Sequence, residues 1–179
     1  MPVDAPHEAN EAVREFVRLV KNYIELAEHV EQLSAHEFLS RCAIILPQLY
    51  AAGHCLPDVE PSGEEGTTVS DSEEREHRDR EALLRQKVAS LLGKYDMYAE
   101  VFDPVFEKEV VTGLLSNDLS EVYADLREPF LLYERGNSRD AIWDWKSGLQ
   151  FHYGHHIVDA LRVIHQLITD HMPSDWRNS

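Results

Sequence analysis

The chain has 179 residues, of which 43% are hydrophobic and 28% are charged, a balance typical of a globular protein. Its formal net charge of −16 repels the phosphates of nucleic acids and anionic lipid surfaces, so we predict no nucleic acid partner and no membrane partner. The length favours a single helical domain over residues 8–172.

A cytoplasmic location is expected from two features. No apolar run approaches the roughly 18 residues that a membrane span needs, and residues 1–12 lack the basic and apolar regions of a signal peptide. Cys42 and Cys55 fall on or near one predicted helix, where they could not easily be bridged. Two free thiols fit a reducing compartment.

Two amphipathic helices are predicted in the first third of the chain. Residues 8–32 place apolar side chains at helical spacing with charged residues largely on the other side. Ser34 and Glu37 have the spacing of a capping box, which starts a second helix that should end around Gly53. Pro47 lies inside that helix and predicts a kink near residues 43–47.

A linker and a third helix follow. Residues 56–71 are rich in Pro, Gly, Ser, Thr and acid without an apolar period, so we expect a flexible acidic loop. A helix capped by Asp71 or Ser72 should run to Leu92 and stop at Gly93.

The second half of the chain is also predicted to be helical. Residues 95–106 are interpreted as a short helix ending before Pro104. A fifth helix should run from Asn117 or Asp118 to about Arg135, with Gly136 and Asn137 as its stop. The last helical region, residues 139–171, begins after a Ser138 cap and should bend near Gly148 or Gly154. No segment predicts a strand.

This order of elements favours an all-α fold. Most connections are short and no repeat of solenoid period is present, so successive helices should pack into an antiparallel helical bundle of five to seven helices.

Histidines on the last helix are the first candidates for chemistry. His152 and His156 are four residues apart, a spacing that lets two side chains share a metal ion. However, no Glu follows the first histidine, and a third ligand would have to come from another helix. The pattern favours capping or hydrogen-bonded structural histidines, so we predict no bound metal and no cofactor. His152 and His156 are the candidate ligands for the alternative in which a metal binds.

Carboxylates form the second candidate group. Asp118, Glu121, Asp125 and Glu128 lie on one face of the fifth helix, nearly opposite its apolar residues, and we expect that face to be solvated unless a neighbouring helix covers it. Glu74 and His77 have the ExxH spacing of di-iron bundles, but their surroundings are too hydrophilic for such a site. The chain contains no GxSxG, P-loop, GxGxxG or CxxC motif, so the usual hydrolase, nucleotide-binding and redox signatures are absent.

Three stretches together resemble a known family. They are LGKYDMY at 92–98 with VFDP at 101–104, DLSEVYADL at 118–126, and FHYGHH at 151–156 with ALR at 160–162 and His165. Their order and spacing are similar to the bacterial domain-of-unknown-function family 5063. The resemblance implies an all-helical cytoplasmic protein without an assigned activity. It also places six residues on the family's polar motif positions: Asp118, Tyr123, Asp125, His152, His156 and His165.

Two functions are carried forward. The first is a non-enzymatic protein-interaction or self-association module with a protein partner or a homodimer, because catalytic signatures are absent and aromatic residues are many. The alternative is a ligand-binding or metal-dependent enzyme that uses a His/Asp cluster between the fifth and last helices. Asp118 or Asp125 would then accept hydrogen bonds from His152, His156 or the Tyr123 hydroxyl.

Overall fold

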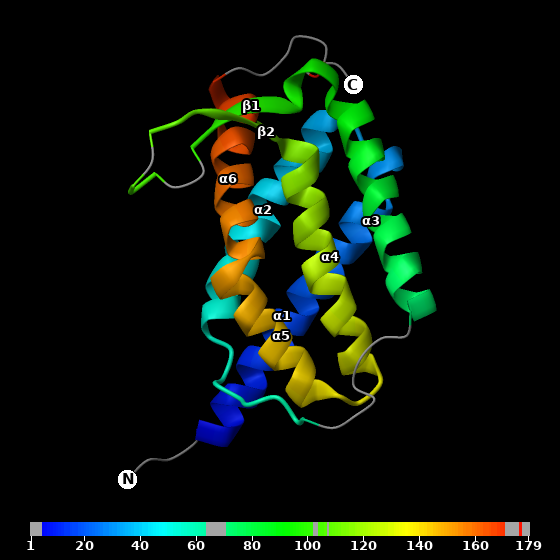
Figure 1. The fold of residues 1–179 in the computed structure, drawn as a ribbon, viewed down its shortest axis with the longest axis vertical. Helices are drawn as coiled ribbons and strands as arrows, with labels where there is room; N and C mark the ends of the chain where they lie inside the picture. The colour runs from blue at the N-terminus through cyan, green and yellow to red at the C-terminus, as the bar shows by residue number, and fades with distance from the viewer. Residues whose placement is uncertain (1–4, 64–70, 102–103, 107, 171–175, 177–179) are drawn as a thin grey trace.

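The computed structural model describes residues 5–63, 71–101, 104–106, 108–170 and 176. Within them the all-α prediction is confirmed (Figure 1). The helices are α1 (Ala5–Glu28), α2 (Ala35–His54), α3 (Asp71–Leu92), α4 (Leu115–Glu134), α5 (Ser138–Phe151) and α6 (Tyr153–His165). Short helical turns cover Val30–Gln32, Gly93–Tyr95 and Gln166–Asp170, and two strands, β1 (Met97–Glu100) and β2 (Val111–Leu114), form a small sheet.

The first two helices begin and end close to the expected residues. The Ser34 hydroxyl accepts a hydrogen bond from the backbone N–H of Glu37, which is one half of the predicted capping box. The other half is absent, because the Glu37 carboxylate pairs with Arg41 one turn further on. Helix α2 continues through Pro47 without a break in its helical assignment.

The segment after α2 is held against α5 where the structure describes it. Asp140 accepts hydrogen bonds from the backbone N–H and the hydroxyl of Ser62, at 2.6 and 2.7 Å. The Lys146 ammonium donates to the backbone carbonyl of Leu56 at 2.7 Å. Residues 64–70 of the predicted loop lie outside the described residues.

The prediction of a short helix over residues 95–106 was wrong. Residues 97–100 are β1, which pairs antiparallel with β2 so that Tyr98 lies opposite Gly113. A Cβ on Gly113 would lie 2.4 Å from the Tyr98 ring, so this glycine makes room for the aromatic side chain. Two four-residue strands are too short to show a period of two in the sequence, and their β-branched and aromatic residues were the remaining signal.

The last helical region bends where a bend was expected. His152 separates α5 from α6 with φ −143° and ψ −87°, and Gly148 and Gly154 flank it. A Cβ on Gly154 would lie only 2.1 Å from the backbone carbonyl oxygen of Leu149, so the junction requires glycine there. The predicted stop after α4 is confirmed too. The helix ends at Glu134, and Gly136 has φ +92°, a left-handed backbone conformation that glycine adopts readily after a helix.

One hydrophobic cluster joins all six helices, with Trp145 of α5 fully buried near its centre. The indole N–H of Trp145 donates to the carbonyl of Leu126, and the Tyr153 hydroxyl donates to the carbonyl of Trp145. The Tyr23 hydroxyl likewise donates to the carbonyl of Leu119. Since every one of these polar tips has a partner, the aromatic rings are buried without leaving a donor unsatisfied.

Helix α4 packs against four other helices, α1, α3, α5 and α6. Figure 1 shows α4 between α6 and α3, with the two strands across one end of the bundle. Its acidic face, which we define as Asp118, Glu121, Asp125 and Glu128, therefore lies between two neighbouring helices. Among the described helices, none is long and apolar enough to cross a membrane.

We predict that Gly154→Ala destabilises the protein by about 2 kcal/mol or more, because a backbone carbonyl cannot move aside for the added methyl group. Urea unfolding followed by circular dichroism measures the change. The control is Gly148→Ala, where the nearest atoms belong to the Tyr153 ring at 3.1 Å and the gain in helix propensity offsets the crowding, so its stability should stay within about 1 kcal/mol of the native value. Equal losses in the two variants would contradict this reading of the junction.

Candidate functional site

The acidic face of α4 is partly covered, so the expectation of a solvated face was wrong for its first residue. Asp118 is only 4% exposed, and Glu121, Asp125 and Glu128 are each intermediate in exposure. The helical wheel of α4 placed these carboxylates opposite its own apolar residues. It could not show that α3 and α6 pack along their two sides.

Asp118 links three elements through its carboxylate. Its Oδ1 lies 2.9 Å from Nδ1 of His156 on α6, and its Oδ2 accepts a hydrogen bond of 2.7 Å from the Tyr98 hydroxyl on β1. A buried carboxylate is costly unless it is hydrogen-bonded, and these two bonds satisfy both oxygens.

A second histidine pairs with a second carboxylate, about two turns further along α4. Nδ1 of His152 lies 2.6 Å from Oδ2 of Asp125. The His152 and His156 rings meet edge to face with centroids 5.0 Å apart. The two histidines are four residues apart and their carboxylates on α4 are seven residues apart, and each imidazole has its own carboxylate.

Glu121 completes the group, which we call the polar cluster: Tyr98, Asp118, Glu121, Asp125, His152 and His156. One carboxylate oxygen of Glu121 and one ring nitrogen from each of His152 and His156 all lie within 4.8 Å of one another. Four of the six sequence-predicted residues thus converge, namely Asp118, Asp125, His152 and His156. Sequence reasoning named Glu121 only as part of the acidic face and did not name Tyr98.

The other two predicted residues lie elsewhere. The Tyr123 hydroxyl donates to the Glu28 carboxylate of α1 at 2.9 Å, on a different side of α4 from the histidines. His165 is exposed near the end of α6. Tyr123 therefore ties α4 to α1, while His165 lies outside the polar cluster.

Burial and charge shift the pKa values of the central pair. Burial raises the pKa of Asp118, against the hydrogen bonds from His156 and Tyr98 that lower it. Burial is the largest single influence and would lower the pKa of His156, but the hydrogen bond to Asp118 and the negative charges of Asp118, Glu121 and Asp125 together outweigh it, so the net direction is upward. The pair therefore keeps one shared proton to a higher pH than the separate groups would in water.

Helix α3 adds a residue to this region that the sequence did not single out. Arg85 donates to Asn117 at 3.1 Å, and Nε2 of His77 lies 3.9 Å from a Glu128 carboxylate oxygen. These two contacts fix an antiparallel register that places Glu81 across from Glu121. Burial, then the charge of Glu121, raises the pKa of Glu81.

The chain folds as a helical bundle with a small hairpin and carries a His/carboxylate cluster beside α4. Residues 7–170 match the family model "Domain of unknown function (DUF5063)", so the chain belongs to that family. No curated protein matches the chain.

A solved structure shows the same fold. The crystal structure of protein BF1032 from Bacteroides fragilis is similar over 91% of this chain and 94% of its own, with a TM-score of 0.73 and 23% identity. At this identity the likeness concerns the fold alone.

We predict that Asp118→Asn lowers the stability by about 2 kcal/mol, because His156 and Tyr98 lose a charged acceptor in a buried place. Tyr98→Phe should cost about 1 kcal/mol. The double variant should lose less than the sum, since both changes remove the same hydrogen bond. Urea unfolding measures all three. The control Asp79→Asn changes an exposed acid on α3 and should be neutral within about 0.5 kcal/mol; an Asp118→Asn protein as stable as this control would contradict the prediction.

A pH-dependent prediction concerns Asp144 of α5. Burial, then the nearby charges of Glu128 and Asp140, raises its pKa to about 6. The Asp144 carboxyl therefore holds its proton more tightly in the folded than in the unfolded chain. Its contribution to the free energy of unfolding is complete below the unfolded pKa and is lost as the pH rises through about 6. Asp144→Asn should therefore stabilise the protein by about 1 kcal/mol at pH 8, allowing for solvent screening, and by nearly nothing at pH 4. Chemical denaturation at both pH values measures the difference, and a gain that is the same at both would be incompatible with it.

Proposed function

We propose that this protein is a non-enzymatic interaction module that self-associates through the β1–β2 hairpin, residues 97–114. The observation that carries the proposal is a concentration of exposed apolar side chains. Of the twelve large hydrophobic residues exposed among the described residues, six lie in this hairpin: Met97, Val105, Phe106, Val110, Val111 and Leu114. Apolar surface gathered in this way is typical of protein–protein contact sites.

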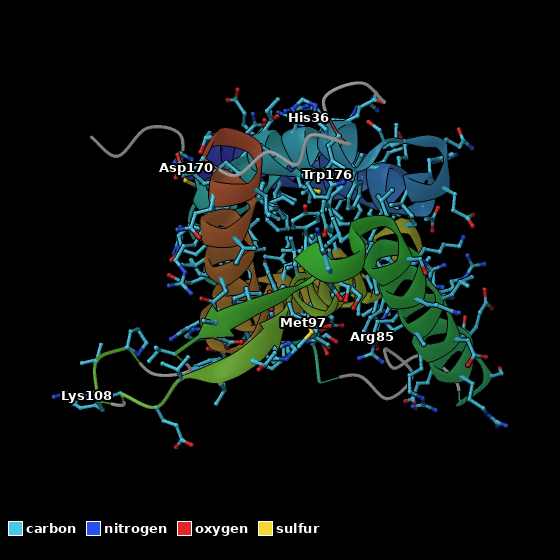
Figure 2. All side chains as sticks on the ribbon, turned by 90° about the horizontal axis from the view of Figure 1, so that it is seen from above. His36, Arg85, Met97, Lys108, Asp170 and Trp176 are labelled. Carbon is cyan, nitrogen blue, oxygen red and sulfur yellow. The ribbon has the colours of Figure 1, made fainter. Side chains whose placement is uncertain are left out.

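The hairpin projects from a firmly anchored base. Figure 2 shows it extending beyond the helices, with Lys108 at its far end. At the base, Asp96 accepts hydrogen bonds from the backbone N–H and the hydroxyl of Ser116, and Arg162 of α6 donates to the carbonyl of Ala99. Together with the bond from Tyr98 to Asp118, these contacts fix the direction of the hairpin before any partner binds, which lowers the entropic cost of association.

The occupant that fits this surface is a second copy of the chain. Within the described residues the sheet has two strands, and β2 pairs with β1 alone. A two-stranded sheet is marginal by itself, and the sequence of β2, Val-Thr-Gly-Leu, carries none of the charges that normally protect an edge strand. Pairing β2 with its copy about a two-fold axis would make a four-stranded sheet and cover apolar residues of both hairpins.

The net charge of −16 opposes contact between two copies, and salt weakens that repulsion. Self-association through an apolar patch should therefore become stronger as the salt concentration rises. A partner protein attracted by the acidic surface would show the opposite dependence.

A cytoplasmic location is part of the same proposal. It is supported by Cys42, which is buried, and Cys55, which is exposed, both with free thiols.

We predict a dimer in size-exclusion chromatography with light scattering, with a dissociation constant that falls between low and high salt. Val111→Lys and Phe106→Ser should shift the population toward monomer without changing the circular dichroism spectrum. Ile44→Ser, which alters an exposed apolar residue on α2, serves as the control and should leave the dimer intact. A native protein that stays monomeric at every salt concentration, up to the solubility limit, would refute the self-association.

A further inference from the structure

The polar cluster has the composition and geometry of a metal site. One atom from each of Glu121, His152 and His156 lies within 4.8 Å of the others, although Glu121 comes from α4, His152 from the α5–α6 junction and His156 from α6. Ligand atoms around a tetrahedral ion with bonds of about 2.1 Å are about 3.4 Å apart, so side-chain adjustments of about an ångström would bring the three together on one ion.

The hydrogen bonds of the two histidines leave the right atoms for an ion. Nδ1 of His152 faces Asp125 and Nδ1 of His156 faces Asp118, at 2.6 and 2.9 Å. A carboxylate at Nδ1 fixes the tautomer that carries its proton there, so Nε2 keeps its lone pair. Carboxylate–histidine pairs of this kind orient the imidazole ligands of zinc proteins. Here two such pairs stand side by side with their rings 5.0 Å apart.

A third residue holds one of the orienting carboxylates in turn. Tyr98 donates to the second oxygen of Asp118 at 2.7 Å, so Asp118 keeps its position whether or not His156 moves toward an ion. The two histidine–carboxylate pairs, with Glu121 beside them, bring three potential ligand groups together.

The charge of the region also calls for a cation. The carboxylates of Asp118, Glu121 and Asp125 all come from α4 and lie beside the two imidazoles, and α3 brings Glu81 close enough for the charge of Glu121 to act on it. Among cations on these elements, Arg85 bonds to Asn117 and Arg162 bonds to the carbonyl of Ala99. Neither hydrogen bond goes to a carboxylate of the polar cluster, and the charge of Arg85 acts on Glu81.

We propose that Glu121, His152 and His156 bind one divalent transition-metal ion of the zinc or cobalt type. Two imidazoles and a carboxylate suit these borderline ions, whereas calcium and magnesium prefer oxygen ligands alone. Glu81 of α3 supplies the fourth ligand, so the ion joins α3, α4 and α6.

The test uses the full chain without a histidine tag, stripped with a chelator and titrated with Co²⁺ and then Zn²⁺. We expect one visible Co²⁺ absorption band that saturates at one ion per chain and is displaced by Zn²⁺. The melting temperature should rise by about 5 °C or more at a hundredfold excess over the dissociation constant, because the ion binds only the folded chain.

Matched variants assign the ligands. Glu121→Gln and His152→Ala should weaken Co²⁺ binding at least about tenfold, and so should Glu81→Gln, while Asp125→Asn should weaken it by about 10- to 100-fold through the orientation of His152. His165→Ala, an exposed histidine on the same helix, is the control and should bind like the native chain. Circular dichroism confirms that each variant is folded.

Several results would overturn the proposal. A native chain that gives no Co²⁺ absorption and no rise in melting temperature with either ion excludes the site. Binding that survives in both Glu121→Gln and His152→Ala, or that is lost in His165→Ala, shows that the ion binds elsewhere. Unchanged binding in Glu81→Gln alone removes the fourth ligand and overturns the three-helix form of the site.

Discussion

The buried carboxylate of Asp118 is the constraint on which the functional face of this protein depends. It is almost fully buried, and both of its oxygens are bonded, one to His156 of α6 and one to Tyr98 of β1. Such a group is stable inside a protein only while its partners stay in place. The position of α6 on α4, and the direction in which the hairpin leaves the bundle, therefore depend on the same carboxylate.

The two features proposed here to carry function meet at that residue. On one side, the second oxygen of Asp118 holds the base of an apolar hairpin. On the other side, its first oxygen orients a histidine toward His152 and Glu121. The proposed ion site and the base of the hairpin thus share one hydrogen-bonded group, Asp118.

How far the sequence predicted the site differs from residue to residue. Sequence reasoning could name His152, His156, Asp118 and Asp125 because each pair lies at helical spacing and falls within the stretches that resemble the family. Glu121 was placed on the acidic face, but the wheel of a single helix predicted solvent where α6 packs. Glu81 carried no signal, since it lies in a strongly charged helix and only the antiparallel register with α4 brings it near the cluster. Tyr98 was assigned to a helix, and a helix would not have directed its hydroxyl to Asp118.

The sequence by itself determined the helical bundle. Apolar residues recurring every three or four positions define a buried side for each helix, and Gly93 and Gly136 end two of them, because these are local properties of the chain. Tertiary structure alone decided the strands of the hairpin, the cover over the acidic face of α4 and the choice of residues that converge. Strands of four residues gain their stability from a partner strand elsewhere in the chain. The exposure of a polar face depends on which helix packs beside it. The local periodicity of the sequence therefore predicts neither feature.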